Sequence, residues 1–441
     1  MDRTEIRAAL ERWYRAAVDA AEPAAAMRRV LAGEPRPHLA PAILAIGKAA
    51  HGMARGAVAW LAELGLDPAG GVVIAHAEDA PAHPSLVSAV GDHPLPASRS
   101  LAASAALAEA IARVPPGAPV MVLLSGGASS LIAAPLDGIT PEELRRAFLI
   151  FHEIGFEIEA MNALRRRLTL WSGGRLAAAL HGHEVTAWVI SDVIGNDLAT
   201  IGSGPLVPEN IEIGHLLQAL TQPGLLSRLP TSVVSALKSS IPGVVRSIPH
   251  RIVADSRTAA EGARSAIARA GYEVVVHRRP LRGPVEAAVG EVVAEIDEHR
   301  NTHRVADRPG HILTRPIPRE PEFMIWTGET TIELPRGHGH GGRAQQFALM
   351  AASALASFGE PDAASILAAG TDGRDGPTDA AGAVVDAITA ADIAARGINI
   401  DESIARADAY PALAAVGALM RTGPTGTNVA DVVIAQVWNW Y

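Results

Sequence analysis

The sequence has no cysteine and only two lysines, Lys48 and Lys238, although 38 of its 441 residues are basic. Without cysteine the chain forms no disulfide, no thiolate nucleophile, no cysteine-ligated zinc site and no iron–sulfur cluster. The other basic residues are arginine, whose rigid fork differs from the flexible ammonium of lysine. Each lysine therefore either has a role that arginine cannot take over or is present by chance.

Long hydrophobic runs are also missing. Apolar stretches such as residues 119–136 are broken by glycine, proline or serine, so we expect no membrane span, and the charged N-terminus does not resemble a signal peptide. A net charge of −9 and a pI near 6.0 argue against nucleic acid as the main partner. We therefore expect a cytoplasmic globular protein that binds small molecules, and the sequence leaves open a homo-oligomer.

Short apolar runs alternate with helix-like segments, which indicates largely parallel sheets covered on both faces. We expect an α/β fold with two α/β domains, a Rossmann-like three-layer parallel sheet in residues 1–240 and a second α/β domain in residues 241–441. The strand near 432–434 is an element that could return to the first domain. We also predict one amphipathic helix over residues 4–33 and an exposed loop over 299–321.

Polar or glycine-rich turns follow the predicted strands, where ligands of parallel sheets bind. Lys48 follows a strand and precedes a helix, an arrangement that suits an anion, although a lone surface lysine is the alternative. The turn 125–130 has two glycines that could present N–H groups to an anion, or could simply cap a helix. Asp192 could hold Mg²⁺ or accept a hydroxyl proton, whereas Asn196 and Asp197 could equally cap a helix.

Further turns of this kind occur in the second half. Residues 337–342 match G-x-G-x-x-G, a weak signal for a dinucleotide when it stands alone, and Arg343 follows at a helix start. Asp372 and Asp375 lie in one later turn and are weaker metal-binding candidates than Asp192. Thr425 and Asn428 lie in another turn and could contact hydroxyls or phosphates. We expect all these turns to form one anion-binding cleft.

In combination, these motifs resemble the class II glycerate 2-kinase family, also called MOFRL-type glycerate kinases, whose members have also been called hydroxypyruvate reductases. The resemblance covers nearly the whole chain and rests on the segments Ile46–Ala50, Leu124–Ser130, Ser172–Leu176, Ser191–Val193, Ser203–Pro205, Gly328–Thr331, Gly341–Arg343, Ala368–Gly373, Gly376–Asp379 and Thr422–Asn428.

The resemblance implies a cleft between the two domains that binds ATP and glycerate, and transfer of the γ-phosphoryl group to the 2-hydroxyl of D-glycerate with Mg²⁺ present. It places the family's active-site lysine and arginine at Lys48 and Arg343, and we add Asp192 as a catalytic and metal-binding residue. The expected cofactor-binding residues are Ser125, Gly126, Gly127, Ser129, Ser130, Asp372, Thr425 and Asn428. The expected substrate-binding residues are Lys48, Arg165, Arg343 and Gln345.

The sequence departs from the family pattern at His338, Ala344 and Gln346, where the family has Asn, Asn and Glu, and at Ser172, where it has Lys. These differences bear on the acceptor, so a longer or more anionic sugar acid is an alternative to glycerate. Two other functions stay open: an NAD(P)H-dependent hydroxypyruvate reductase, favoured by the match at 337–342, and a non-catalytic sugar-acid binding protein.

Overall fold

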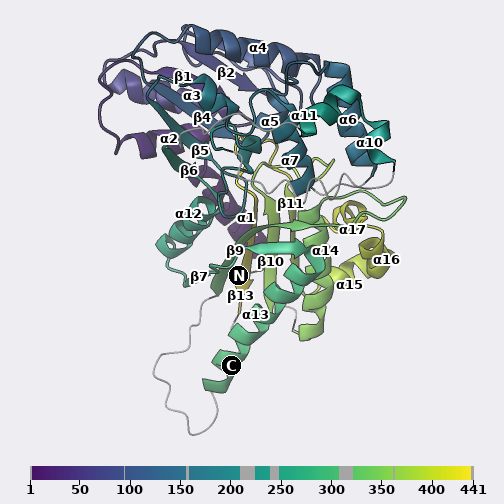
Figure 1. Cartoon of the computed structure of the whole chain (residues 1–441). Coiled ribbons are helices and arrows are strands. Elements are labelled where there is room, and N and C mark those ends of the chain that lie inside the picture. The colour runs from purple at the N-terminus through teal and green to yellow at the C-terminus, as the bar shows by residue number, and fades with distance from the viewer. Residues whose placement is uncertain are drawn as a thin grey trace. The chain divides into compact units, whose positions relative to one another are not determined.

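The computed structural model describes residues 2–93, 95–154, 158–208, 224–238, 248–306, 321–360 and 363–438 (Figure 1). The chain forms two compact units. The parallel-sheet unit is Pro23–Val253, and the mixed-sheet unit combines Met1–Glu22 with Ala254–Tyr441. The boundary that we expected at residue 240 lies outside the described residues. The two units divide instead after Val253, and the N-terminal 22 residues belong with the C-terminal half.

The parallel-sheet unit is built on a six-stranded sheet in the order β3-β2-β1-β4-β5-β6. Its strands are β1 (Ala42–Ile46), β2 (Gly71–Ala75), β3 (Leu86–Val90), β4 (Val120–Ser125), β5 (Val185–Ile190) and β6 (His250–Ala254). The pairs from β3 to β5 are parallel, and β1 to β4 is the point at which the strand order reverses. This order is that of the Rossmann fold, so the prediction for the first sheet is confirmed.

Helices cover both faces of this sheet. Leu44 and Val72 share a buried cluster with Leu107 of α4 (Ser98–Ala112). Right-handed crossovers place α3 (Ala50–Glu63) on the opposite face, where it packs on β1 and β2 and against α2 (Pro23–Leu31). The other described helices of the unit are α5 (Ala128–Leu131), α6 (Pro141–Glu153), α7 (Ile158–Leu168), α8 (Arg175–Ala179), η1 (Ile201–Ser203), α10 (Leu225–Arg228) and α11 (Thr231–Lys238).

The mixed-sheet unit contains a seven-stranded sheet in the order β12-β11-β10-β13-β9-β7, with β8 paired to β9. Its strands are β7 (Val274–Val276), β8 (Leu281–Pro284), β9 (Glu322–Thr331), β10 (Ala364–Gly370), β11 (Gly382–Asp386), β12 (Leu419–Met420) and β13 (Asp431–Val437). β13, the strand near 432–434, lies between β10 and β9 in this sheet. Because β9 and β10 are both antiparallel to β13, their carboxyl ends meet at one edge.

The helices of this unit cover its sheet and supply much of its core. They are α1 (Arg3–Ala20), α12 (Ser256–Arg269), α13 (Val285–Ala306), α14 (Arg343–Leu355), η2 (Ala356–Phe358), α15 (Thr389–Ala395), α16 (Ile400–Ala405) and α17 (Ala409–Ala415). Phe347 and Leu355 of α14 pack with Val292 of α13 and with Met324 of β9 in one buried cluster. The same cluster extends to β10 through Ile366, so the core joins helices and sheet.

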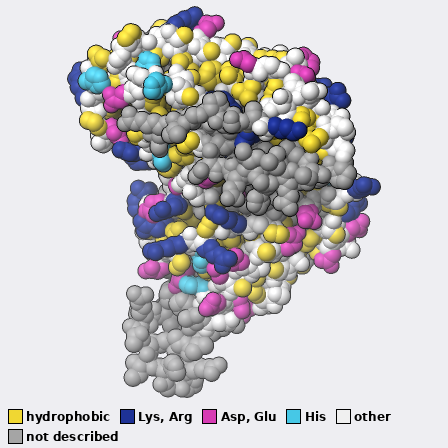
Figure 2. Space-filling view, in the orientation of Figure 1, with side chains coloured by type: hydrophobic (Ala, Val, Ile, Leu, Met, Phe, Trp, Pro, Cys, Tyr) yellow, Lys and Arg dark blue, Asp and Glu magenta, His cyan; other side chains and the backbone are white. Residues whose placement is uncertain are grey.

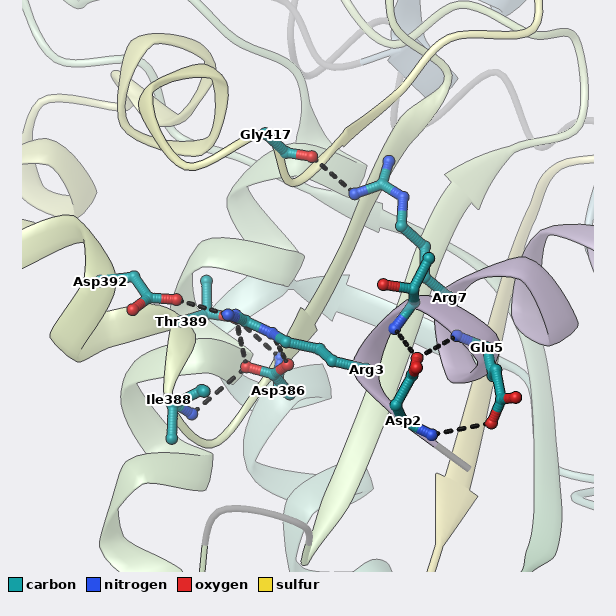
Figure 3. Close-up of polar contacts among 10 residues, drawn as sticks. Asp2, Arg3, Glu5, Arg7, Asp386, Ile388, Thr389, Asp392 and Gly417 are labelled. Atoms are coloured by element: carbon teal, nitrogen blue, oxygen red, sulfur yellow. Dashed lines mark hydrogen bonds and ion pairs between the residues drawn. The ribbon is translucent and has the colours of Figure 1, made fainter.

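Hydrogen bonds from the first helix explain why residues 1–22 belong to the mixed-sheet unit. The single helix predicted over residues 4–33 is wrong: α1 ends at Ala20, and α2 begins at Pro23, which proline allows because a helix start needs no N–H there. The guanidinium of Arg3 donates to Asp386 at 2.5 Å and to Asp392 at 2.6 Å (Figure 3). Arg7 donates to the carbonyl oxygen of Gly417 at 2.6 Å.

The predicted loop at 299–321 is partly wrong, because α13 continues through Ala306. The reason is burial rather than local propensity. Arg300 is 3% exposed, pairs with Glu360 and lies 5.0 Å from the centre of the Phe358 ring. Residues 307–320 lie outside the described part of the chain.

On the visible face, basic and acidic side chains lie interspersed with apolar atoms (Figure 2). Among the described residues, oppositely charged side chains also pair between adjacent helices, as Arg28 of α2 does with Glu63 of α3 at 2.7 Å. Among the described residues, none of the helices combines the length and the apolar character that spanning a membrane needs.

Candidate active site

Two predicted turns meet at the carboxyl edge of the parallel sheet. The N–H of Lys48, just after β1, donates to the carbonyl oxygen of Gly126, just after β4, at 2.9 Å. The N–H of Ala49 donates to the hydroxyl oxygen of Ser125 at 3.0 Å. Lys48 and the glycine turn are thus fixed side by side at the point where the strand order reverses, which is where open α/β sheets bind ligands.

The two glycines of this turn are required by close packing. Gly127 has a φ of 84°, which disfavours other residues, and a Cβ on Gly126 would overlap the carboxylate of Asp192 beyond β5. The predicted Asp192 therefore lies against the glycine turn. The hydroxyl of Ser125 joins the two turns, while Ser129 and the buried Ser130 follow in α5.

Two histidines that sequence reasoning missed lie at the same edge. His76 follows β2 directly, and His93 comes shortly after β3. The pKa of His93 is lowered to about 4, first by desolvation and then by the charges of Lys48, His76 and Arg165. Desolvation lowers the pKa of Arg165 on α7, whose Nη1 donates to Asn162 at 3.1 Å. For His76 the available signal was a histidine directly after an apolar strand, whereas His93 has no such local signal.

A second cluster lies at one edge of the mixed sheet, around Arg343 at the start of α14. Its Nε donates to Asp431 at 2.7 Å, and its Nη1 donates to Glu329 at 2.5 Å. Burial is the first effect on the pKa of Arg343 and opposes its charge, but the two carboxylates outweigh it and raise the pKa. Burial raises the pKa of Asp431, and Arg343 opposes that rise.

Asp375 caps the first turn of α14. Its carboxylate accepts from the N–H of Gln345 at 2.8 Å and from the N–H of Ala344 at 3.2 Å. The side-chain amide of Gln345 donates to Thr378 at 2.8 Å, and Gln345 has no exposed surface. The predicted substrate contact of Gln345 is therefore not supported by this arrangement, because the side chain belongs to the interior of the mixed-sheet unit.

Burial raises the pKa of Asp375 to about 7, although its two N–H donors oppose the rise. A carboxyl with an unfolded pKa near 4 then binds a proton more tightly when folded, so it stabilises the fold at low pH and this contribution is lost as pH rises from about 4 to about 7. We predict that Asp375→Asn removes pH dependence on the order of 3 kcal/mol, measured as urea unfolding at pH 5 and pH 8.

The control is Asp379→Asn, because Asp379 is exposed and Tyr410 and Arg421 lower its pKa. That variant should keep the decline in stability between pH 5 and pH 8. An unchanged decline in Asp375→Asn would contradict the assignment to Asp375.

The remaining predicted turn residues lie beside Asp375 at this edge. The N–H of Thr425 donates to the carbonyl oxygen of Asp372 at 3.2 Å, and its hydroxyl donates to Thr371 at 2.6 Å. The amide oxygen of Asn428 accepts from the N–H of Ala430 at 3.3 Å. The turns after β9, β10 and β12 are thus brought together within the mixed-sheet unit, and a single cleft formed by all the predicted turns stays a prediction.

The G-x-G-x-x-G match at 337–342 does not have the context of a dinucleotide site. β9 and β10, the strands before and after α14, are separated by the antiparallel β13, whereas the Rossmann unit pairs such strands directly. A Cβ on Gly339 would overlap Asp408, and one on Gly342 would overlap Asp375. The first N–H groups of α14 already bind Asp375, so they are not free for a pyrophosphate.

Three of the four departures from the family pattern are interior positions. Ala344, Gln346 and Ser172 are each at most 4% exposed. Gln346 donates to the carbonyl oxygen of Ile404 at 2.9 Å, and Ser172 accepts from Thr169 at 2.8 Å. These substitutions therefore change packing and internal hydrogen bonds, which weakens them as signs of a different acceptor.

No group of three or more His, Asp or Glu side chains suited to a metal is found within the described residues. Mg²⁺ does not require such a cage, because it is usually held by one or two carboxylates together with water and substrate phosphates. Asp192, beside the glycine turn, fits that donor set in the parallel-sheet unit.

Both units collect glycine turns and charged side chains at one sheet edge, which is typical of α/β enzymes for anionic small molecules. Residues 9–238 match a domain of unknown function (DUF4147), and residues 322–431 match the MOFRL family. The D-glycerate 2-kinase of Thermotoga maritima is 32% identical over 398 residues, 90% of each chain. The glycerate 2-kinase of Pyrococcus horikoshii is 30% identical and covers 78% of this chain and 76% of its own.

The fold is shared as well. A crystal structure of glycerate kinase from Thermotoga maritima matches with a TM-score of 0.83 and 29% identity, over 99% of this chain and 100% of that one. The chain therefore belongs to the MOFRL-type glycerate 2-kinase family, which confirms the resemblance found in its motifs.

Proposed function

We propose that the protein is an ATP-dependent kinase that transfers the γ-phosphoryl group to the 2-hydroxyl of D-glycerate or a closely related hydroxy acid. The observation that carries this proposal is the similarity to the D-glycerate 2-kinase of Thermotoga maritima over 90% of the chain. The placement of Lys48 at the strand-order reversal of a Rossmann-like sheet supports it, because phosphoryl transfer depends mainly on positioning and on charge stabilisation.

The residues of the parallel-sheet unit have distinct roles in this proposal. Lys48 neutralises charge on the transferring phosphoryl group, and the turn at 125–130 orients nucleotide phosphate through Ser125, Gly126, Gly127, Ser129 and Ser130. Asp192 accepts the hydroxyl proton or holds Mg²⁺, whose charge would assist the transfer. Arg165 binds an anionic group of the substrate.

In the mixed-sheet unit, Arg343 binds the substrate and neutralises charge once a ligand competes with Asp431 and Glu329 for the guanidinium. Asp372, Thr425 and Asn428 stay predicted nucleotide contacts, and a cytoplasmic location and a homo-oligomer stay predictions. The reductase is disfavoured because the glycine turn before Arg343 lacks a dinucleotide-binding context.

The deciding experiment uses the purified full chain with D-glycerate, ATP and MgCl₂. We expect ADP formation that depends on glycerate and stops on addition of EDTA, and a phosphorus NMR signal of 2-phosphoglycerate rather than 3-phosphoglycerate. L-Glycerate is the matched control, and hydroxypyruvate with NADH or NADPH tests the reductase. Absence of glycerate-dependent ADP would refute the kinase, and a longer acid that outcompetes glycerate would correct the acceptor.

A further prediction concerns the packing of Asp192 against the glycine turn. Gly126→Ala places a methyl group onto the Asp192 carboxylate, so we expect kcat/KM for D-glycerate to fall by about 10-fold to 100-fold. The control is Gly290→Ala in α13, where a Cβ would meet no atom of another element within 4 Å and kcat/KM should not change. Wild-type kcat/KM in Gly126→Ala would remove Asp192 from the mechanism.

A further inference from the structure

Three neighbouring strands of the parallel sheet each end in a basic side chain. Lys48 follows β1, His76 follows β2, and His93 comes shortly after β3. The ring of His93 and the side chain of Lys48 flank the same turn: a Cβ built on Gly127 would lie 3.1 Å from His93 Cδ2 and 3.3 Å from Lys48 Cγ. The pKa of His93 also responds to the charge of Arg165, which places that guanidinium nearby.

No carboxylate forms an ion pair with these basic groups in the part of the chain that the structure describes. No ion pair to Lys48, His93 or Arg165 is present among the described residues, and Arg165 donates only to the neutral amide of Asn162. The acid next to His93, Asp92, is already engaged.

The carboxylate of Asp92 accepts from Arg99 Nε at 2.7 Å and from two N–H groups at the start of α4, those of Arg99 and Ser100. It therefore caps a helix instead of facing the basic groups. Asp192 is the other carboxylate described at this edge, where it packs against Gly126, and no ion pair joins it to Lys48 among the described residues. Like charges held together without a counter-ion repel one another, and an anionic ligand removes that repulsion.

We propose that His93 is a ligand-binding residue of this enzyme, and that its ring contacts an oxyanion held between Lys48 and Arg165. His93 is an exposed residue whose ring lies partly desolvated against the glycine turn, so a ligand at the sheet edge can reach it. The lowered pKa keeps the ring neutral at neutral pH, which lets one ring nitrogen donate to the oxyanion without adding to the repulsion among the cations. The identity of the molecule that carries the oxyanion rests on the proposed function. The contact between His93 and an oxyanion does not.

That molecule is either the hydroxy acid, through its carboxylate, or ATP, through a phosphate. Titration calorimetry without turnover separates the two. D-Glycerate alone, a non-hydrolysable ATP analogue with MgCl₂, and pyrophosphate are titrated into wild type and His93→Asn. We expect His93→Asn to weaken one of the first two ligands by about 10-fold to 100-fold, the effect of losing a hydrogen bond to a charged group.

A loss confined to D-glycerate assigns the carboxylate, and a loss confined to the ATP analogue and pyrophosphate assigns a phosphate. His38→Asn is the matched control, because the side chain of His38 is 63% exposed and lies before β1, at the opposite end of that strand from Lys48. Wild-type affinity of His93→Asn for all three ligands overturns the proposal. Because no turnover is needed, a failed kinase assay would not affect this test.

A second measurement applies if circular dichroism shows that His93→Asn is unfolded. Nitrogen-15 spectra of the histidine rings are recorded for the wild type with and without each ligand, and His93→Gln identifies the His93 signals. We expect those signals to move when D-glycerate or the ATP analogue saturates the enzyme. If no histidine ring signal moves with any of the three ligands, His93 is not a contact and the proposal is wrong.

Discussion

Lys48→Met is expected to lower kcat/KM for D-glycerate by about 1,000-fold while leaving the fold intact. The side chain of Lys48 runs beside the glycine turn, with its Cγ 3.3 Å from a Cβ built on Gly127. Losing one preorganised charge at a transferring group typically costs 10²–10³ in rate, roughly 3–4 kcal/mol. Lys48→Arg keeps the charge but replaces a compact ammonium with a broad fork, so we expect a loss of about 10-fold to 100-fold. Initial rates of ADP formation at varied glycerate and ATP concentrations give both values.

Lys238→Met is the matched control because it removes the other lysine of the chain. Lys238 is exposed at the end of α11, and its replacement should change kcat/KM by less than about twofold. Full activity of Lys48→Arg would show that charge alone is needed at this position. Full activity of Lys48→Met would remove Lys48 from the mechanism.

Arg343→Ala is expected to lower both activity and the stability of the mixed-sheet unit. The side chain of Asp431 is 14% exposed and pairs with Arg343, so the substitution leaves a largely buried carboxylate without its counter-ion. Breaking a fully buried pair costs about 3–5 kcal/mol, and we expect about 2 kcal/mol here because Arg343 is itself one-third exposed. The measurement is the midpoint of urea unfolding, followed by tryptophan fluorescence.

The double variant Arg343→Ala/Asp431→Asn separates the two effects. Replacing the unpaired Asp431 carboxylate with an amide should restore most of the unfolding midpoint. The value of kcat/KM should stay about 100-fold below wild type if Arg343 acts on the substrate. Recovery of activity together with stability would mean that Arg343 is only a structural partner of Asp431. An unchanged midpoint in the single variant would contradict the buried pair.

Much of the parallel-sheet unit could be predicted from local pattern, because each buried parallel strand is a continuous apolar run. β1, β2 and β5 are runs of this kind, at Ala42–Ile46, Gly71–Ala75 and Val185–Ile190. β3 is harder to recognise in the sequence, because it is an edge strand with two exposed residues and its run of apolar side chains is weak. The turns after β1, β4 and β5 lie at one edge of the sheet, because parallel strands place their carboxyl ends together.

The interior of the mixed-sheet unit could not be predicted in this way. Gln345 and Asp375 are polar, so sequence alone suggests that they lie at the surface or in a site. Inside the protein, however, Gln345 donates hydrogen bonds to Asp375 and to Thr378. His93 was missed because nothing local marks it, and its position depends on the order of strands in the sheet. Long-range pairing determines both cases, whereas the patterns in the sequence report mainly on near neighbours.

The position of α1 has a consequence for how the protein is made. The hydroxyl of Tyr14 donates to the carbonyl oxygen of Gly370 at 2.7 Å, and that of Thr427 donates to Ala21 at 2.8 Å. Because α1 is synthesised before Pro23–Val253, it must wait for the strands after Ala254 before its unit can close, whereas Pro23–Val253 is one continuous piece of chain. A recombinant C-terminal half that starts at Ala254 would lack this helix, and supplying residues 1–22 as a separate peptide should complete it.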